Sequence, residues 1–252
     1  MLVPSASHHI GCALDIVEIL VYLYFDFLNV YPKKPNHPNR DIFILSKGHA
    51  ASALYAVLVL KGFFPKKVLL AYDQNGGTLP EHASRVAPGV ELSTGSLGHG
   101  LPVGTGFALA AKNDKSNKKI VVLMSDGELD EGSNWESIMF AAHHKLNNLI
   151  AIIDKNDFQG YASTDKVLNL SPLLKKFEVF GWEGIEIDGH DFSELKNAFK
   201  RFKYSNDKPK VVICNTIKGK GVSIFEGKFE SHYKSLSADE KQEALKELEG
   251  QK

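Results

Sequence analysis

The sequence is short of the residues that mark several large classes of protein. It has only two cysteines in 252 residues, Cys12 and Cys214, and both lie in helical or apolar patterns typical of buried or half-buried thiols, which argues against a disulfide framework. Basic and acidic residues balance at 30 each, so no net positive field favours nucleic acid or an acidic membrane surface. With 43% hydrophobic residues, the chain can still bury a sizeable core, in one large domain or two small ones.

Long apolar runs and targeting signals are missing as well. The longest apolar stretches are too short to span a bilayer, and residues 1–11 lack the basic and apolar regions of a secretory signal. We therefore expect a soluble, cytoplasmic protein that binds neither nucleic acid nor membrane. No internal repeat or low-complexity linker divides the chain, so we expect one domain over residues 1–252, ending in a charged, solvated helical tail at about 237–252.

Helical and strand-like patterns alternate along the chain. The apolar strands Ile120–Met124 and Leu149–Ile153 flank a helical pattern, with Ser133 and Glu136 as a capping box at its start. A strand–helix–strand unit of this size predicts neighbouring parallel strands. The sequence therefore predicts an α/β fold: an open, mostly parallel sheet with helices on both faces. Other segments of the alternation are the helices Asp15–Leu28, Ala51–Lys61 and Phe192–Phe202 and the strands Ile42–Leu45, Gly184–Ile187 and Lys210–Thr216.

A long irregular segment, Gln74–Gly100, interrupts this alternation. It is rich in Gly, Pro and Ser and has little periodicity. A loop of this length inside a compact domain is usually functional or disordered. Because it contains two histidines and a run of glycines, the sequence favours a functional loop.

Acidic and polar side chains follow two of the strands directly. Four acidic residues crowd into positions 125–131, among them Asp126, and Asn156 comes shortly after the next strand. Because ligands in open α/β sheets bind at the carboxyl ends of the strands, we expect both side chains at one edge. Their oxygens suit Mg²⁺ when phosphate oxygens and water complete its shell. The sequence therefore predicts a divalent cation and a diphosphate at this edge, where Gly127 lets the backbone come close.

Asp126 and Asn156 also belong to a longer pattern. Their segments resemble the thiamine diphosphate-binding motif of transketolase and its relatives, usually Gly-Asp-Gly followed at about this spacing by Asn. The chain is identified as a member of this family, similar to the amino-terminal half of transketolase from about His9 to His232. The segments that carry the resemblance, in the same order, are "SHHIG" (7–11), "ILSKGHA" (44–50), "LPEH" (79–82), "STGSLGHG" (93–100), "IDGHD" (187–191) and "TIKGKGVSIFEG" (216–227).

The resemblance implies particular roles for these positions. Asp126, Asn156 and the backbone oxygen of Phe158 would hold the metal, Mg²⁺ or else Ca²⁺ or Mn²⁺. Glu131 would lie near the subunit contact that links neighbouring sites. The residues implied to bind the cofactor, the metal-binding side chains included, are His49, Gly95, Ser96, Leu97, Asp126, Gly127, Glu131, Asn156, Lys218 and His232.

Four histidines from separate segments are implied to be catalytic: His9, His49, His82 and His232. Thiamine diphosphate acts as an electron sink while a carbon–carbon bond of a ketose breaks. Each step moves a proton near neutral pH, which is the range where imidazole titrates. Taken singly, each of these residues would be an ordinary core or surface histidine, and only their joint place in the family pattern favours function.

Full transketolases continue into two further domains after this region, so the resemblance implies the amino-terminal subunit of a split transketolase. A separate carboxyl-terminal subunit would supply the pyrimidine-binding domain, in a heterotetramer with two chains of each kind. The complex would transfer a two-carbon ketol unit from a ketose or ketose phosphate to an aldose acceptor. Departures from the family pattern at Cys12, His99 and Ser231 point to a specialised sugar substrate.

Other functions fit the same residues. The scaffold supports other thiamine diphosphate chemistry, such as a deoxyxylulose-phosphate-synthase-like reaction, and a non-catalytic binding module would keep the fold without the chemistry. Asp126 and Gly127 by themselves would be an ordinary turn. His143 and His144 are expected on a solvated helix face, and His190 suits a turn-stabilising role as well as a site role.

Overall fold

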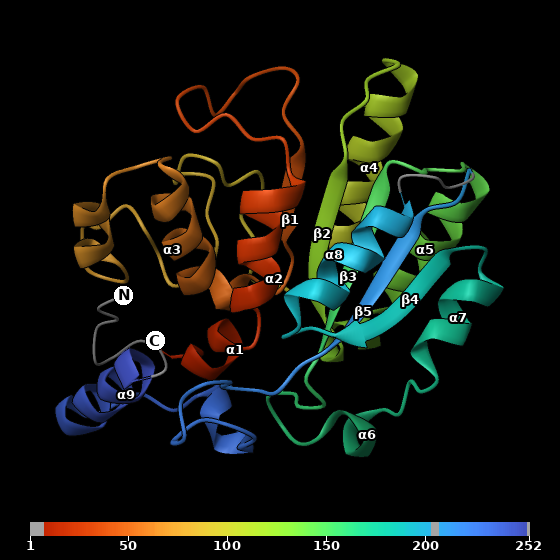
Figure 1. Cartoon of the computed structure of the whole chain (residues 1–252). Coiled ribbons are helices and arrows are strands. Elements are labelled where there is room, and N and C mark those ends of the chain that lie inside the picture. Colours follow the sequence, from red (N-terminus) through yellow and green to blue (C-terminus); the bar gives the residue numbers. More distant parts are fainter. Residues whose placement is uncertain (1–7, 203–206, 251–252) are drawn as a thin grey trace.

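A five-stranded sheet forms the middle of the molecule (Figure 1). The computed structural model describes residues 8–202 and 207–250. Neighbouring strands are parallel throughout, in the order β1-β2-β3-β5-β4, which confirms the predicted open parallel sheet. The strands are β1 (Ile42–Leu45), β2 (Ile120–Ser125), β3 (Leu149–Lys155), β4 (Glu183–Asp188) and β5 (Lys210–Asn215).

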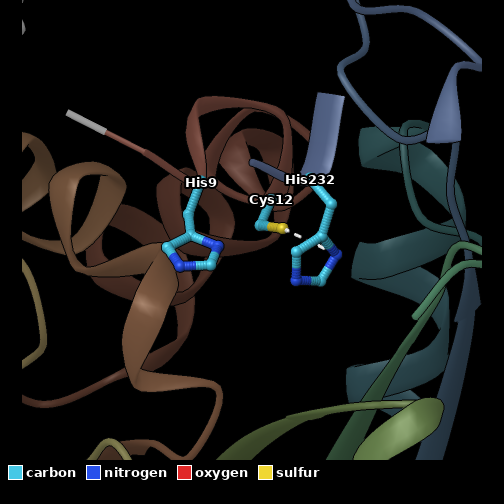
Figure 2. A group of neighbouring side chains, drawn as sticks. All are labelled: His9, Cys12 and His232. Atoms are coloured by element: carbon cyan, nitrogen blue, oxygen red, sulfur yellow. Dashed lines mark hydrogen bonds between the residues drawn. The ribbon is translucent and has the colours of Figure 1, made fainter. Parts of the chain in front are cut away.

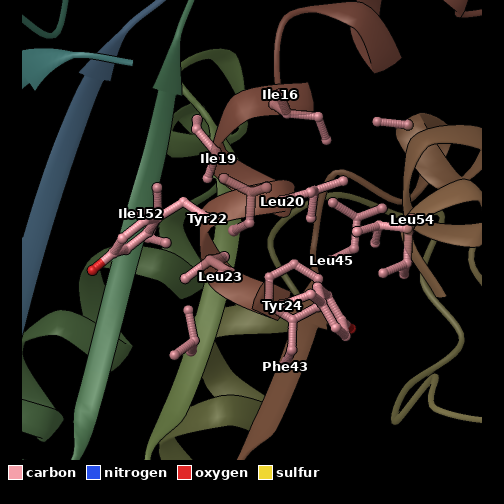
Figure 3. Packing of buried hydrophobic residues seen from close by; sticks show 14 of the residues in the cluster. Ile16, Ile19, Leu20, Tyr22, Leu23, Tyr24, Phe43, Leu45, Leu54 and Ile152 are labelled. Atoms are coloured by element: carbon pink, nitrogen blue, oxygen red, sulfur yellow. The ribbon is translucent and has the colours of Figure 1, made fainter. Parts of the chain in front are cut away.

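Helices cover both faces of the sheet, also as predicted. Alternate residues of a strand point to opposite faces, so Val121 and Leu123 of β2 enter one core while Val122 and Met124 enter the other. Figure 3 shows the first core, where β1 and β3 pack against α2 and α3. The helices are α1 (Ile10–Leu14), α2 (Val17–Tyr22), α3 (Ala51–Lys61), α4 (Gly100–Asn113), α5 (Gly132–His143), α6 (Thr164–Val167), α7 (Leu173–Val179), α8 (Phe192–Arg201) and α9 (Ala238–Gly250).

The unit β2-α5-β3 has the predicted crossover form. Its strands are paired in parallel, and the register sets Ser125 opposite Asp154 at their carboxyl ends. The predicted capping box is wrong, because Glu131 is the residue that precedes α5 and no side chain caps this end. The hydroxyl of Ser133 instead donates to the backbone oxygen of Gly98, at 2.6 Å, and ties the glycine-rich loop to α5.

The helix predicted over Asp15–Leu28 is present as α2 with the π-helical turn that follows it, and a separate short helix, α1, precedes it. The two helices are separated at Asp15 and Ile16, and the π-helical turn covers Leu23–Phe27. The break places the Asp15 carboxylate, which is fully buried, against the carboxyl edge of the sheet. The interruption between α1 and α2 thus sets the buried charge of Asp15 at the site.

The segment Gln74–Gly100 forms no strand of the sheet, and its only helical residue is Gly100, where α4 begins. Backbone hydrogen bonds fix it: the amide of Ala83 donates to Gly48, and that of Thr94 donates to Ala83. The Thr94 hydroxyl also donates to the backbone oxygen of Leu45, at 2.7 Å. The loop is thereby held against the end of β1.

The predicted helical tail is present as α9, although its final residues, 251–252, lie outside the described part of the chain. It is not wholly solvated. Ala244 is buried and packs in a small cluster with Val222 and Phe225, beside Ile10 and Leu14 of α1. No helix within residues 8–202 and 207–250 is long and apolar enough to cross a membrane.

Candidate active site

A cavity of about 310 Å³ opens at the carboxyl edge of the sheet. The segments that follow β3 and β5 leave the sheet here, next to α1 (Figure 1), and the amide of Gly219 donates to the backbone oxygen of Gly11. All but three of the residues predicted for the site line this cavity. Those that line it are His9, His49, His82, Gly95, Leu97, Gly127, Asn156, Phe158, Lys218 and His232.

The four predicted catalytic histidines gather around His9. Its ring centroid lies 5.0 Å from that of His49, 6.1 Å from that of His82 and 5.3 Å from that of His232. They come from four segments: the turn before α1, the short helix Gly48–Ala50, the loop before Ala83, and the short helix Phe229–His232. Each imidazole nitrogen can donate or accept a hydrogen bond, so rings grouped in this way can contact several hydroxyls of one bound substrate.

Two residues beside the cavity adopt a left-handed backbone although neither is glycine. His9 has φ 60° and Asp157 has φ 63°. This conformation disfavours residues with a Cβ atom and is concentrated at functional sites. At His9 it lets the chain enter α1 while the ring faces the other histidines.

Beneath the cavity lies a buried ion-pair network centred on Lys47. Its ammonium contacts Asp154 and lies 3.6 Å from Asp15. Burial opposes the charge, but Asp15 and Asp154 raise the pKa of Lys47 well above its usual range. The Asn156 amide donates to both carboxylates at 2.9 Å, which turns its oxygen toward the backbone amide of Phe158, 3.0 Å away. The network thus fixes the orientation of the Asn156 side-chain amide, with its nitrogen toward the carboxylates and its oxygen away from them.

Lys218 differs from Lys47 in that no carboxylate of the described residues forms a salt bridge with it, although the Cys12 thiol, whose pKa Lys218 lowers, is near. Lys218 is 1% exposed and lines the cavity, yet it forms no salt bridge with any residue that the structure describes. A buried ammonium is costly unless an anion compensates it. Because the cavity side is open, an anionic ligand can supply that compensation, and a diphosphate fits.

Asp126 is buried at the end of β2 and is held by three donors. Its oxygens accept from the amides of Gly127 and Asp157, at 2.8 and 2.9 Å, and from the hydroxyl of Thr164, at 3.0 Å. Burial and the nearby Asp154 raise the pKa of Asp126 to about 6. A divalent cation would offset this crowding of buried carboxylates, so the donor set suits Mg²⁺.

The predicted metal ligands are only partly brought together. Asn156 and Phe158 line the main cavity, whereas Asp126 lines a separate cavity of about 50 Å³ with Thr164. The Gln159 side chain packs against Gly127 beside them, where a Cβ atom would lie 2.6 Å from its Cγ. Binding a metal between these oxygens requires the Asp126 carboxylate to turn.

Two other predicted residues lie outside the cavity. Ser96 is exposed between Gly95 and Leu97, which do line it. Glu131 is also exposed and packs against Gly98. The departures His99 and Ser231 face elsewhere: His99 is exposed before α4, and the Ser231 hydroxyl donates to the backbone oxygen of Lys228 at 2.6 Å.

The third departure, Cys12, lies inside the histidine group. Its thiol is fully buried and 3.8 Å from Nδ1 of His232. Burial alone would raise the pKa of this thiol, yet Lys218 and the imidazoles around it lower that pKa well below its usual range. The pKa of His49 is also lowered, here by burial, from 6.5 to about 4, which favours the neutral ring.

Several cavity residues were not predicted. Lys47 lies within the segment 44–50, where a lysine between Ser and Gly in a buried position was an available signal. Gln159, Tyr161 and Tyr233 come from loops whose sequences show no such signal. His143 and His144 are exposed as expected, and His190 stabilises turns: its ring nitrogens contact Glu18 and the amide of Ile217.

A second cavity, of about 200 Å³, lies between α1, α3 and α9. Its lining is almost entirely apolar, with residues such as Leu14, Phe225 and Leu248. It offers none of the clustered charges and imidazoles found at the carboxyl edge. The chemistry therefore selects the cavity at the edge as the active-site candidate.

Comparison with known proteins identifies the family. The family model described as transketolase, thiamine diphosphate binding domain, matches residues 3–251. The chain belongs to the transketolase family. Three predictions are confirmed: the family, the parallel-sheet fold, and the function as one subunit of a thiamine diphosphate-dependent transketolase.

The relatives include chains of similar and of much greater length. One of the subunits of the apulose-4-phosphate transketolase of Actinobacillus succinogenes is 48% identical over 96% of this chain and 88% of its own. The 6-deoxy-6-sulfo-D-fructose transketolase subunit SqwG of Clostridium sp. is 42% identical over 96% and 88%. The solved transketolase from Leishmania mexicana superposes with a TM-score of 0.89 at 27% identity, covering 97% of this chain and 38% of that one.

Proposed function

We propose that this chain is the thiamine diphosphate-binding subunit of a two-chain transketolase that moves a two-carbon ketol unit from a ketose to an aldose acceptor. The observation that carries the proposal is the buried Lys218, which forms no salt bridge with any described residue, in the same cavity as the four-histidine group. The ammonium of Lys218 suits a diphosphate cofactor, which is an anion. The histidines suit a polyol substrate, whose hydroxyls must gain and lose protons.

The cofactor would be held through its diphosphate, by direct contacts to the chain and through a bound metal ion. Lys218 would contact the diphosphate, and Gly127 gives the phosphates access to the backbone. Mg²⁺, or Ca²⁺ or Mn²⁺ in its place, would be bound by Asp126, Asn156 and the backbone oxygen of Phe158. Bound thiamine diphosphate supplies the electron sink for breaking and forming the carbon–carbon bond.

The chain's own residues then position the sugar and move its protons. His49 is neutral at physiological pH, with a pKa of about 4, so it is able to accept a proton. Nδ1 of His9 is buried and has no hydrogen-bond partner among the described residues, so it is free to meet a hydroxyl group. The rings of His82 and His232 both lie close to that of His9 and can hold neighbouring hydroxyls.

The assembly would be a heterotetramer of two such chains and two carboxyl-terminal subunits that carry the pyrimidine-binding domain. The names of the relatives, which call each of them one subunit of a transketolase, support a separate partner, and those relatives are matched over 88% of their own length. We place the complex in the cytoplasm, because both cysteines are buried and free. The substrates are a ketose, free or phosphorylated, and an aldose.

The proposal is tested by native mass spectrometry. A tagged chain is isolated from its own host in Mg²⁺ buffer, and the mass of the assembly and its cofactor content are recorded. We expect two copies with two of a second chain, with thiamine diphosphate retained and with ketol-transfer activity that His82→Ala reduces at least ~100-fold. A chain that stays alone and takes up no cofactor, even with thiamine diphosphate added, contradicts the proposal.

The metal assignment is tested on the same assembly. Asp126→Ala removes the only predicted carboxylate ligand, so Mg²⁺-dependent binding of thiamine diphosphate should be lost in calorimetric titration. Asp239→Ala, at an exposed carboxylate of α9, is the matched control and should bind normally. Unchanged binding by Asp126→Ala would remove Asp126 from the metal site.

A further inference from the structure

We propose that His9, Cys12 and His232 form a binding site for a soft transition-metal ion, Zn²⁺, that is distinct from the Mg²⁺ site. Figure 2 shows the three side chains, with the Cys12 sulfur between the two imidazole rings. One ligand atom from each residue can be chosen so that all three lie within 4.8 Å of one another. The pair Sγ of Cys12 and Nδ1 of His232 is already 3.8 Å apart.

The geometry needs little adjustment to close around an ion. Zinc binds sulfur at about 2.3 Å and imidazole nitrogen at about 2.0–2.1 Å, which sets ligand atoms roughly 3.5 Å apart in a tetrahedron. The side chains therefore have to move by about 1 Å, which rotation about χ1 and χ2 provides. The backbone of His9 has a left-handed conformation that sets the direction of its side chain. The side chain of Cys12 is fully buried in α1.

An independent observation also points to a ligand here. Nδ1 of His9 is shielded from solvent, and no described residue gives it a hydrogen bond. Buried polar atoms without partners are rare and unfavourable, so such an atom marks a place where a ligand is missing. A metal ion beside the Cys12 sulfur would use this nitrogen.

The donor set selects the ion. One thiolate and two imidazoles are the ligands of Zn²⁺ and related soft ions, while Mg²⁺ prefers carboxylate and carbonyl oxygens. Three protein ligands leave a fourth position, and His9 and His232 both line the cavity, so that position opens toward substrate. The two metal sites therefore differ in ion and in place.

Cys214 provides the contrast within the same chain. It is equally buried, in β5, but its neighbours in the sheet are the strands β3 and β4 and it belongs to no such group of ligands among the described residues. A thiol that serves packing alone needs no imidazoles around it. The two cysteines therefore form a matched pair for experiment.

Occupancy would have a consequence for catalysis, and this part rests on the proposed function. His9 and His232 are proposed to handle substrate protons, and a bound metal would withdraw both rings from that task. Zn²⁺ should therefore inhibit the assembled enzyme in competition with the sugar, while the primary test below needs neither sugar nor cofactor.

Cobalt serves as the spectroscopic probe, because Co²⁺ replaces Zn²⁺ and absorbs in the near ultraviolet when a thiolate binds it. The untagged chain is titrated with Co²⁺ in buffer that contains a phosphine reductant, which keeps the cysteines reduced. We expect a thiolate-to-cobalt band that saturates at one equivalent, is displaced by Zn²⁺ and is unaffected by excess Mg²⁺. Cys12→Ser should abolish the band, and Cys214→Ser should leave it intact.

A second variant covers the case in which Cys12→Ser does not fold, as judged by circular dichroism. Asparagine tolerates a left-handed backbone, so His9→Asn keeps the turn and removes the imidazole. It should weaken Co²⁺ binding at least ~10-fold. The proposal is overturned by a wild-type chain without the thiolate band, by a band that survives in Cys12→Ser, or by unweakened binding in His9→Asn. Cobalt bound only at the exposed pair His143 and His144 would lack the band and would likewise overturn it.

Discussion

The interior of the sheet and its carboxyl edge are built on opposite principles. Within β2 and β3, residues such as Val122 and Ile152 are fully buried and apolar on both faces. A few residues further along the same strands, Asp126, Asp154 and Asn156 are almost as deeply buried but polar or charged. The interior of these strands contains only apolar side chains packed against one another. The edge contains buried charges, and not all of them form salt bridges with described residues.

Two buried lysines make the difference concrete. Lys47 has two carboxylates within 4.0 Å, and Lys218 has none among the described residues. A fold that needed only stability would gain little from a buried ammonium without a paired carboxylate, because its desolvation cost exceeds what packing of its stem provides. The edge is therefore shaped for a ligand, and each part of this contrast can be broken by substitution.

The largest effect on folding is expected at Lys47. Lys47→Met leaves Asp15 and Asp154 buried without a cation, so the free energy of unfolding should fall by about 3–5 kcal/mol. Chemical denaturation of the chain measures it. A loss below about 1 kcal/mol would mean that the network is solvated in solution and that the edge differs less from the surface than its burial indicates.

A smaller effect is expected from the interior. Ile152→Val removes one buried methylene group from the core on the α2 side and should cost about 0.5–1.5 kcal/mol. Because the residue is remote from the cavity lining, affinity for thiamine diphosphate with Mg²⁺ should be unchanged in calorimetry. A change in affinity would show that packing inside the sheet affects cofactor binding at its carboxyl edge. The two regions would then not be independent.

The smallest effect is a pH dependence from His49. Its pKa is about 4 in the folded chain against an ordinary 6.5, so the unfolded chain binds more protons between these values. Stability should therefore be complete above pH 6.5 and fall as the pH drops toward 4. His49 is partly exposed, which screens its charge and keeps the effect modest. In His49→Gln this part of the slope should vanish in denaturation curves between pH 4 and 6.5, and an equal slope in both proteins would contradict the assignment.

Local patterns in the sequence were enough to predict most of the fold. The apolar strands and the crossover between them follow from residues that are neighbours in the chain. The same register brought Asp126 and Asn156 to one edge, as expected. The gathering of the four histidines was predictable only through the family resemblance, since they come from segments that meet only in three dimensions.

The remaining details depend on contacts that no local pattern encodes. Ser133 bonds to Gly98 rather than capping its own helix, because the glycine-rich loop folds against α5. The carboxylate of Asp126 points to Asp157 and Thr164 because the loop after β3 returns past the end of β2. The family pattern singled out Lys218, but no local pattern shows that Lys47 is paired and Lys218 is not, since the difference lies in which carboxylates reach each ammonium.

The most direct test of a diphosphate site at this edge compares Lys218→Met with the wild type by titrating thiamine diphosphate in excess Mg²⁺ and measuring stability on the same samples. Loss of a charge-assisted contact to phosphate, worth about 1.5–3 kcal/mol, should weaken binding roughly 10- to 100-fold. Stability without cofactor should stay within about 1 kcal/mol of the wild type or rise, because no carboxylate of the described residues forms a salt bridge with the removed charge. Unchanged affinity together with a stability loss as large as that of Lys47→Met would show that Lys218 is a structural residue and that the edge is not a diphosphate site.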